Sequence, residues 1–258
     1  MTEMNGTSRR GLSRRRALQA GVVGGTALWV VPTIDSLYTP AAAASNTGPC
    51  AGGAQTIDWS TFPNAQNGNP GSNAGFPYSP GTFGGTIVTF QLISAGTLVW
   101  GTGESGVQNS AQLGNLTGQF QLYKNVAPVG DTTLLRMRFN KIVKNLDFRI
   151  TDIDISTQPG NNFVDQITVA PYLNGVATSS TFTPDSGTPS FTPPGATTAT
   201  TTTRTGSAAA AANSNVGNLR VQGPASGLDR VDISYVSNQA AGAGTTQVIG
   251  ISDISWSC

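Results

Sequence analysis

Alternating apolar and polar side chains recur along the chain from about residue 55 onward, and they predict β-strands. A period of two gives each strand one apolar face and one polar face, as in antiparallel sheets. The alternation is clearest at Val88–Leu92, Phe120–Leu122, Leu135–Phe139, Leu146–Ile150, Leu219–Val221, Val231–Tyr235 and Ile254–Cys258. Further strands are expected at Gln55–Ser60, Thr97–Trp100, Phe163–Ala170 and Tyr172–Thr178, with a tight turn at Asn174-Gly175.

The pattern predicts an all-β fold, because helical periodicity is hard to find. About eleven short antiparallel strands are typical of a two-sheet sandwich of jelly-roll type. Two segments lack the alternation and are expected to be long irregular loops. Residues 62–85 are rich in Asn, Gly and Pro, and residues 181–215 are rich in Thr, Pro, Ser and Ala.

The first 44 residues resemble a twin-arginine export signal. The run Ser13-Arg14-Arg15-Arg16-Ala17-Leu18 is similar to the motif of that class, and a weakly apolar stretch follows it. The alanines at 41–44 fit a small-residue cleavage site. The resemblance implies that Arg14 and Arg15 direct export and that residues 45–258 act as a single domain outside the cell or at its surface. The alternative is an uncleaved membrane anchor.

The composition of residues 45–258 argues against several classes of function. Residues 45–258 hold nine Lys and Arg against eleven Asp and Glu, so no basic excess favours nucleic acid or an anionic membrane. The chain has no histidine. This excludes a Ser-His-Asp triad, a Cys-His pair and the usual zinc and copper sites. No other catalytic motif is recognisable, so the protein is not expected to be an enzyme.

Two cysteines, Cys50 and Cys258, lie near the two ends of the exported part. In an oxidising exterior they are expected to form a disulfide, which requires the two ends to lie side by side. The alternative is two independent buried thiols.

A run of acidic residues follows the strand at 146–150. Asp152 and Asp154 come where the apolar face switches near Thr151, and Asp165 follows after a short loop. A bulge or strand end there is expected to place the first two at the rim of the sandwich. Clustered carboxylates suit calcium. The alternative is a solvated strand end whose carboxylates cap turn amides.

The same segment carries a second resemblance. Asn145–Asp154, followed by Val164–Val169, is similar to a segment of secreted bacterial lectin-like and adhesin-type β-sandwich modules, and Ile251–Trp256 resembles their last strand. The resemblance implies an extracellular or cell-surface binding or structural module, with a carbohydrate or a surface protein as partner. No repeat array or sorting tail accompanies it, which weakens the case for adhesion.

An aromatic segment offers a second candidate site. Phe76, Tyr78 and Phe83 are spaced among Gly and Pro residues, and exposed rings of this kind stack on sugar faces. The alternative is that these rings pack a long loop onto the core.

Two other functions stay open. A carbohydrate-active hydrolase needs a pair of carboxyl groups across a cleft, which two of Asp152, Asp154, Asp165, Asp253 and Glu104 could supply. A module of a larger assembly would instead show an exposed apolar patch or an unpaired sheet edge.

Overall fold

The structure is a computed structural model, and it describes residues 53–62, 78–94, 96–99, 105–108, 112–125, 128–159, 161–238 and 246–258. Five sets of residues named above lie outside these ranges: the export signal, Cys50, Phe76, Trp100 and Glu104. For Tyr78, the structure describes the backbone only.

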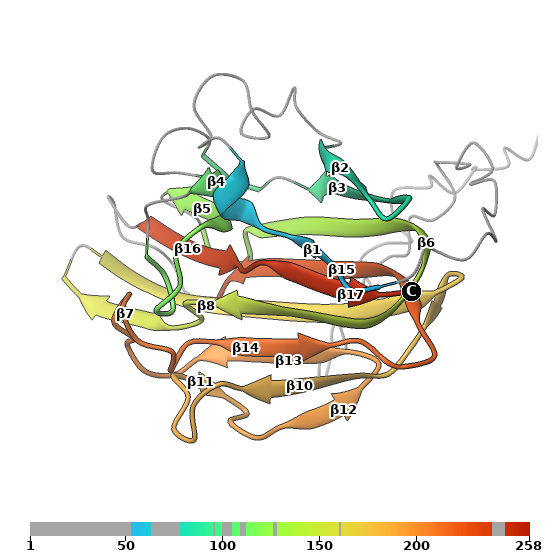
Figure 1. Cartoon of the computed structure of the whole chain (residues 1–258). Helices are drawn as coiled ribbons and strands as arrows, with labels where there is room; N and C mark the ends of the chain where they lie inside the picture. The colour runs from blue at the N-terminus through green and yellow to red at the C-terminus, as the bar shows by residue number, and fades with distance from the viewer. Residues whose placement is uncertain are drawn as a thin grey trace, which may run out of the picture. The chain divides into compact units, whose positions relative to one another are not determined.

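The described residues fold almost entirely as β-strands, which confirms the all-β prediction (Figure 1). One short 3₁₀ helix, η1, covers Trp59–Thr61. The strands are β1 (Gln55–Ile57), β2 (Tyr78–Phe83), β3 (Thr86–Ser94), β4 (Gly106–Gln108), β5 (Gln119–Asn125), β6 (Thr132–Thr151), β7 (Ile155–Gln158), β8 (Asn161–Leu173), β9 (Val176–Ala177), β10 (Ser180–Pro184), β11 (Phe191–Thr192), β12 (Thr197–Ala199), β13 (Thr202–Gly206), β14 (Leu219–Gln222), β15 (Leu228–Ser237), β16 (Thr246–Ile251) and β17 (Ile254–Ser257). Within the described ranges, no helix is long and apolar enough to cross a lipid bilayer.

Strand β6 belongs to two sheets, and all the pairings between the named strands are antiparallel. In sheet 1, the C-terminal half of β6 pairs with β14 along one edge, and β10 and β12 continue the sheet beyond β14. Along the other edge, it pairs with β16 and β17. Strands β5 and β4 continue the sheet beyond β16, and β1 continues it beyond β17. In sheet 2, the N-terminal half of β6 lies between β3 and β15, and the order is β2-β3-β6-β15-β8-β13-β11. The hairpin strand β9 and strand β7 also pair with β8.

A bulge lets β6 serve both sheets. Its buried side chains fall on odd positions up to Val143 and on even positions from Leu146. Asn145 lies between them with φ of 50°, a conformation that a small polar side chain tolerates. An extra residue at such a bulge turns the opposite side of the strand toward the core. Both halves of β6 therefore present their apolar side chains inward.

The two sheets pack their apolar faces together through aromatic rings. The Phe90 ring of β3 stacks on the Phe120 ring of β5 at 5.4 Å between centroids. Trp59 contacts both rings, and its side chain is fully buried. At the other end of the core, Trp256 of β17 meets Phe139 of β6. The inward position of Trp256 agrees with the alternation at Ile254–Cys258, which puts Ile254, Trp256 and Cys258 on one face.

The expectation for residues 181–215 is wrong, because β11, β12, β13 and most of β10 lie there. These strands are rich in Thr and alternate weakly, so their sequence resembles a loop. Hydrogen bonds to β14 and β8 hold them in the sheets. In the other expected loop, residues 62–85, strand β2 pairs with β3 from Tyr78 to Phe83.

The first and last described strands lie side by side. Strand β1 pairs with β17, with Gln55 opposite Trp256, and the C-terminus lies beside β1 (Figure 1). Cys258 packs against the core. Because Cys50 lies outside the described residues, the disulfide stays a prediction, and the pairing of β1 with β17 agrees with it.

Phe90→Ala is expected to lower the free energy of unfolding by about 3–5 kcal/mol, because it removes a buried ring that touches both Trp59 and Phe120. Chemical denaturation measures the change. The matched control is Ile93→Ala on the same strand, where the side chain is 45% exposed and a change within about 0.5 kcal/mol is expected. Equal losses in the two variants would contradict this description of the core.

Candidate functional site

The acidic segment after β6 is a strand end, as the sequence predicts. Strand β6 ends at Thr151, and Asp152 has φ of 65°, which turns the chain. The side chain of Ile153 is then fully buried. The Asp154 carbonyl accepts a hydrogen bond of 3.0 Å from the backbone N–H of Asp165 on β8. The turn therefore brings the three predicted acidic residues to one region.

The rim position expected for Asp152 and Asp154 is wrong for Asp154, which is only 6% exposed, whereas Asp152 is half-buried. Asp165 is fully buried. Asp154 Oδ2 accepts the backbone N–H of Ala210 at 2.8 Å. Asp165 Oδ1 accepts the hydroxyl of Tyr235 at 2.8 Å, whereas Oδ2 has no hydrogen-bond partner. A carboxylate in such a place is costly unless it is protonated.

Burial therefore raises the pKa of each of these carboxyl groups. It raises the pKa of Asp152 to about 6 and, with the Asp152 charge nearby, the pKa of Asp154 to about 7. The pKa of Asp165 lies well above its ordinary value, because burial and the Asp154 charge both favour the protonated form. These three carboxyl groups therefore stay protonated at pH values at which most carboxyl groups are ionised.

Calcium was the metal predicted for Asp152, Asp154 and Asp165. Among the residues that the structure describes, no three acidic or thiol side chains converge as a metal-binding group. Calcium binding there stays a prediction. The alternative interpretation, in which the carboxylates cap turn amides, agrees with the Ala210 contact of Asp154.

Of the predicted aromatic site, only the Phe83 side chain is described. Its ring meets the ring of Trp256 edge to face at 5.7 Å and packs against the core. This contact favours the alternative in which the ring anchors its segment. The contribution of Phe76 and Tyr78 to ligand binding stays a prediction.

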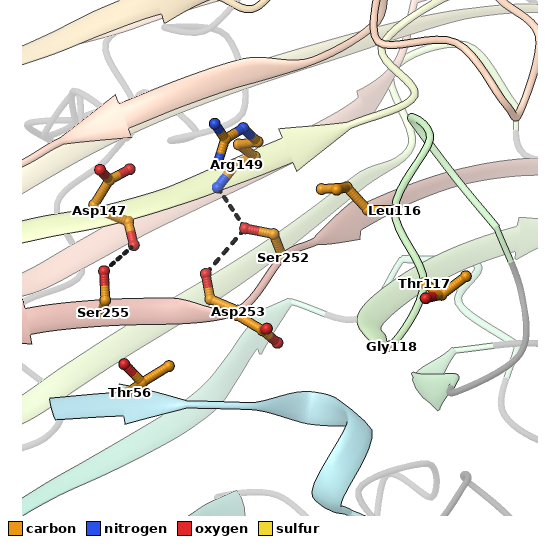
Figure 2. A pocket seen from close by; sticks show the side chains of 9 residues that line it. All are labelled: Thr56, Leu116, Thr117, Gly118, Asp147, Arg149, Ser252, Asp253 and Ser255. Atoms are coloured by element: carbon orange, nitrogen blue, oxygen red, sulfur yellow. Dashed lines mark hydrogen bonds between the residues drawn. The ribbon is translucent and has the colours of Figure 1, made fainter.

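A polar pocket of about 300 Å³ lies on the outer face of sheet 1. Thr56 of β1, Ser255 of β17 and Asp147 of β6 are direct cross-strand neighbours and line one part of it. Figure 2 shows them on three adjacent ribbons. The remaining lining residues are Leu116, Thr117, Gly118, Arg149, Ser252 and Asp253. No aromatic ring is among these nine residues.

The break between β16 and β17 forms another part of the pocket. Ser252 Oγ accepts the backbone N–H of Arg149 at 2.8 Å and donates to the Asp253 carbonyl at 3.0 Å (Figure 2). Trp59 holds the same break from inside the protein. Its indole N–H donates to the Ser252 carbonyl and its backbone N–H donates to Asp253 Oδ1, both at 2.9 Å.

Two of the three charged side chains in the pocket, Asp147 and Arg149, form ion pairs. Asp147 receives two nitrogens of Arg220, and Arg149 Nε pairs with Asp185 at 2.6 Å. Asp253 has no ion pair within the described residues. Only its Oδ1 accepts a hydrogen bond there. Burial, with the Asp58 charge nearby, raises the pKa of Asp253.

Sequence analysis found this pocket only in part. Asp253 is one of the five candidate carboxylates named from the sequence. Thr56, Thr117 and Ser252 carry no motif, and the strand pairings alone bring them together. The polar side chains at the outward positions of β6 and β17 were the sequence signal that could have indicated a polar site on this face.

No known protein family matches the chain, and no curated protein or solved structure matches it significantly.

Asp154→Asn is expected to stabilise the protein at pH 8 and to have little effect at pH 4. The folded-state pKa of Asp154, about 7, lies above its ordinary value of 3.8, so wild-type stability is fully present below pH 4 and is lost as the pH rises through 7. The gain at pH 8 is up to about 4 kcal/mol. Denaturation curves across this range measure it. Asp58→Asn is the control, and a constant offset between Asp154→Asn and wild type would contradict the prediction.

Proposed function

We propose that residues 45–258 form an exported carbohydrate-binding module and that the sheet 1 pocket is its binding site. One observation carries the proposal: Asp253 presents a carboxylate oxygen that has no hydrogen-bond partner among the described residues, in a pocket lined by side-chain hydroxyls. Such an oxygen accepts hydrogen bonds from a ligand hydroxyl. The Thr56 and Thr117 hydroxyls can each donate or accept beside it, and the Ser255 hydroxyl, which donates to the Asp147 carbonyl, can accept.

The pocket chemistry favours a hydroxyl-rich ligand over an apolar one. Leu116 is the only apolar side chain of the lining apart from the methyl groups of its threonines. The volume of about 300 Å³ lies at the small end of ligand pockets, which suits one or two sugar units. Because the nine described lining residues include no aromatic ring, the proposed recognition depends on hydrogen bonds rather than on stacking.

The proposal includes the remaining expectations from the sequence. Export by the twin-arginine route, a cell-surface or extracellular position and a Cys50–Cys258 disulfide are parts of it. So is a jelly-roll topology for the two sheets. Two observations support this set: β1 and β17 lie side by side, and the sheets pack face to face. A structural role without a ligand is the outcome if no glycan binds.

Asp253→Asn is expected to weaken glycan binding by about tenfold or more, since it removes a charged acceptor from the pocket. The asparagine still offers an oxygen to the Trp59 N–H, so the fold is retained. The measurement is binding of the oxidised 45–258 domain to an array of neutral and acidic oligosaccharides, with calcium and again with chelator. Ser255→Ala is expected to act in the same direction.

Asp229→Asn and Ser234→Ala are the matched controls, because they remove the same groups from β15 in sheet 2. The proposal fails if wild type binds no glycan, or if the control variants lose as much affinity as the pocket variants. Loss of binding in chelator alone would support the calcium prediction for Asp152, Asp154 and Asp165.

A second candidate function is glycoside hydrolysis in the same pocket. Asp147 and Asp253 both line it, and the pKa of Asp253 is raised by its burial. Glycosidases use one protonated and one ionised carboxyl group. The raised pKa suits Asp253 as the acid, and the ion pair with Arg220 suits Asp147 as the ionised partner.

If this candidate is right, the wild-type domain releases reducing sugar from one of the oligosaccharides on the array. Asp253→Asn and Asp147→Asn are each expected to lower that turnover by at least about a hundredfold, because each removes one member of the acid–base pair. A reducing-end assay measures it. Binding without any release of sugar, or turnover that survives both substitutions, would exclude hydrolysis by this pair.

A further inference from the structure

Three arginines meet on the outer face of sheet 2, although the exported part has more acidic than basic residues. Arg136 and Arg138 occupy neighbouring outward positions of β6. Arg230 of β15 lies directly opposite Arg138 across the strand pair. Like charges in directly opposite positions destabilise a sheet unless nearby groups offset their repulsion.

The three guanidinium groups differ in how they are neutralised. Arg136 is engaged through Nε and a terminal nitrogen with the two Asp232 oxygens, at 2.8 and 2.9 Å. Arg230 Nε lies 3.4 Å from the same carboxylate and makes no hydrogen bond. Its guanidinium instead stacks on the ring of Tyr172, with its carbon 3.7 Å from the ring centroid.

Arg138 has no hydrogen bond or ion pair with any described residue, and its side chain is on the exposed surface. Its nearest cross-strand neighbours are Thr89 on one side and Arg230 on the other. Burial and the charges of Arg136 and Arg230 lower the pKa of Arg138, and the nearby carboxylates of Asp232 and Asp229 offset this lowering only in part.

We propose that Arg138, with Arg230 and Arg136 beside it, binds an oxyanion group on the outer face of sheet 2. The chemistry is that of a sulfate, carboxylate or phosphate, because the planar fork of a guanidinium donates two parallel hydrogen bonds to such a group. Arg230 is held in place by Tyr172, so its charge is fixed before the ligand arrives. This site is separate from the sheet 1 pocket and does not depend on it.

The experiment titrates the 45–258 domain with inorganic sulfate, inorganic phosphate and a sulfated disaccharide at low ionic strength, using calorimetry. Saturable binding of at least one probe is expected for wild type. Arg138→Gln should weaken it by about tenfold or more, since a charge-assisted contact is lost. Arg138→Lys should restore it only in part, because lysine lacks the fork. Tighter binding of the disaccharide than of both inorganic ions would identify a glycan as the source of the group.

The control is Lys144→Gln, which removes the same charge from an exposed position of β6 outside the arginine group. It should leave binding unchanged. Without ligand, the melting temperature of Arg138→Gln should equal or exceed that of wild type, because repulsion from Arg230 is relieved. The proposal is overturned if wild type binds none of the three probes, if Lys144→Gln weakens binding equally, or if Arg138→Gln lowers the melting temperature.

Discussion

The contacts of Trp59 connect the core of this protein with its surface pocket. Its ring packs against both Phe90 of sheet 2 and Phe120 of sheet 1, which stack on each other. Its two N–H groups donate to Ser252 and Asp253 at the break between β16 and β17. Burial of the ring therefore also orients the pocket carboxylate. A pocket supported in this way is preorganised, which lowers the entropic cost of binding a ligand.

Charged side chains in the interior are paired or favour their neutral form, whereas two charged side chains on the outer faces keep hydrogen-bonding atoms unused. The ammonium group of Lys124 is fully buried, but it donates to the carbonyls of Asp131 and Tyr235 and pairs with the Asp131 carboxylate at 2.8 Å. Asp165 has a hydrogen bond to one oxygen only, so burial favours its protonated form. On the outer faces, Asp253 and Arg138 each keep donor or acceptor capacity unused. Unused capacity on an accessible side chain is available to a ligand.

Local pattern predicted the fold class but not the number or extent of the strands. The alternation at Leu135–Phe139 and Leu146–Ile150 predicted two strands, whereas the chain forms one strand of 20 residues that bends at Asn145. The Thr-rich strands β10 to β13 escaped prediction because their stability comes from neighbours distant in sequence. The acidic turn was predicted correctly as a strand end. Its burial was not predicted, since Ala210 and Tyr235, which contact Asp154 and Asp165, come from elsewhere in the chain.

The sequence by itself determined that this is an antiparallel β-protein, because alternation with a period of two is a local property of each strand. It also indicated the strand end at Thr151 and the inward position of Trp256. Only the tertiary structure decided which polar side chains meet. Thr56, Asp147 and Ser255 share one pocket, and Arg138 faces Arg230, because strand pairing joins residues about a hundred or more positions apart. Such pairings depend on the register and order of strands, which no local pattern encodes.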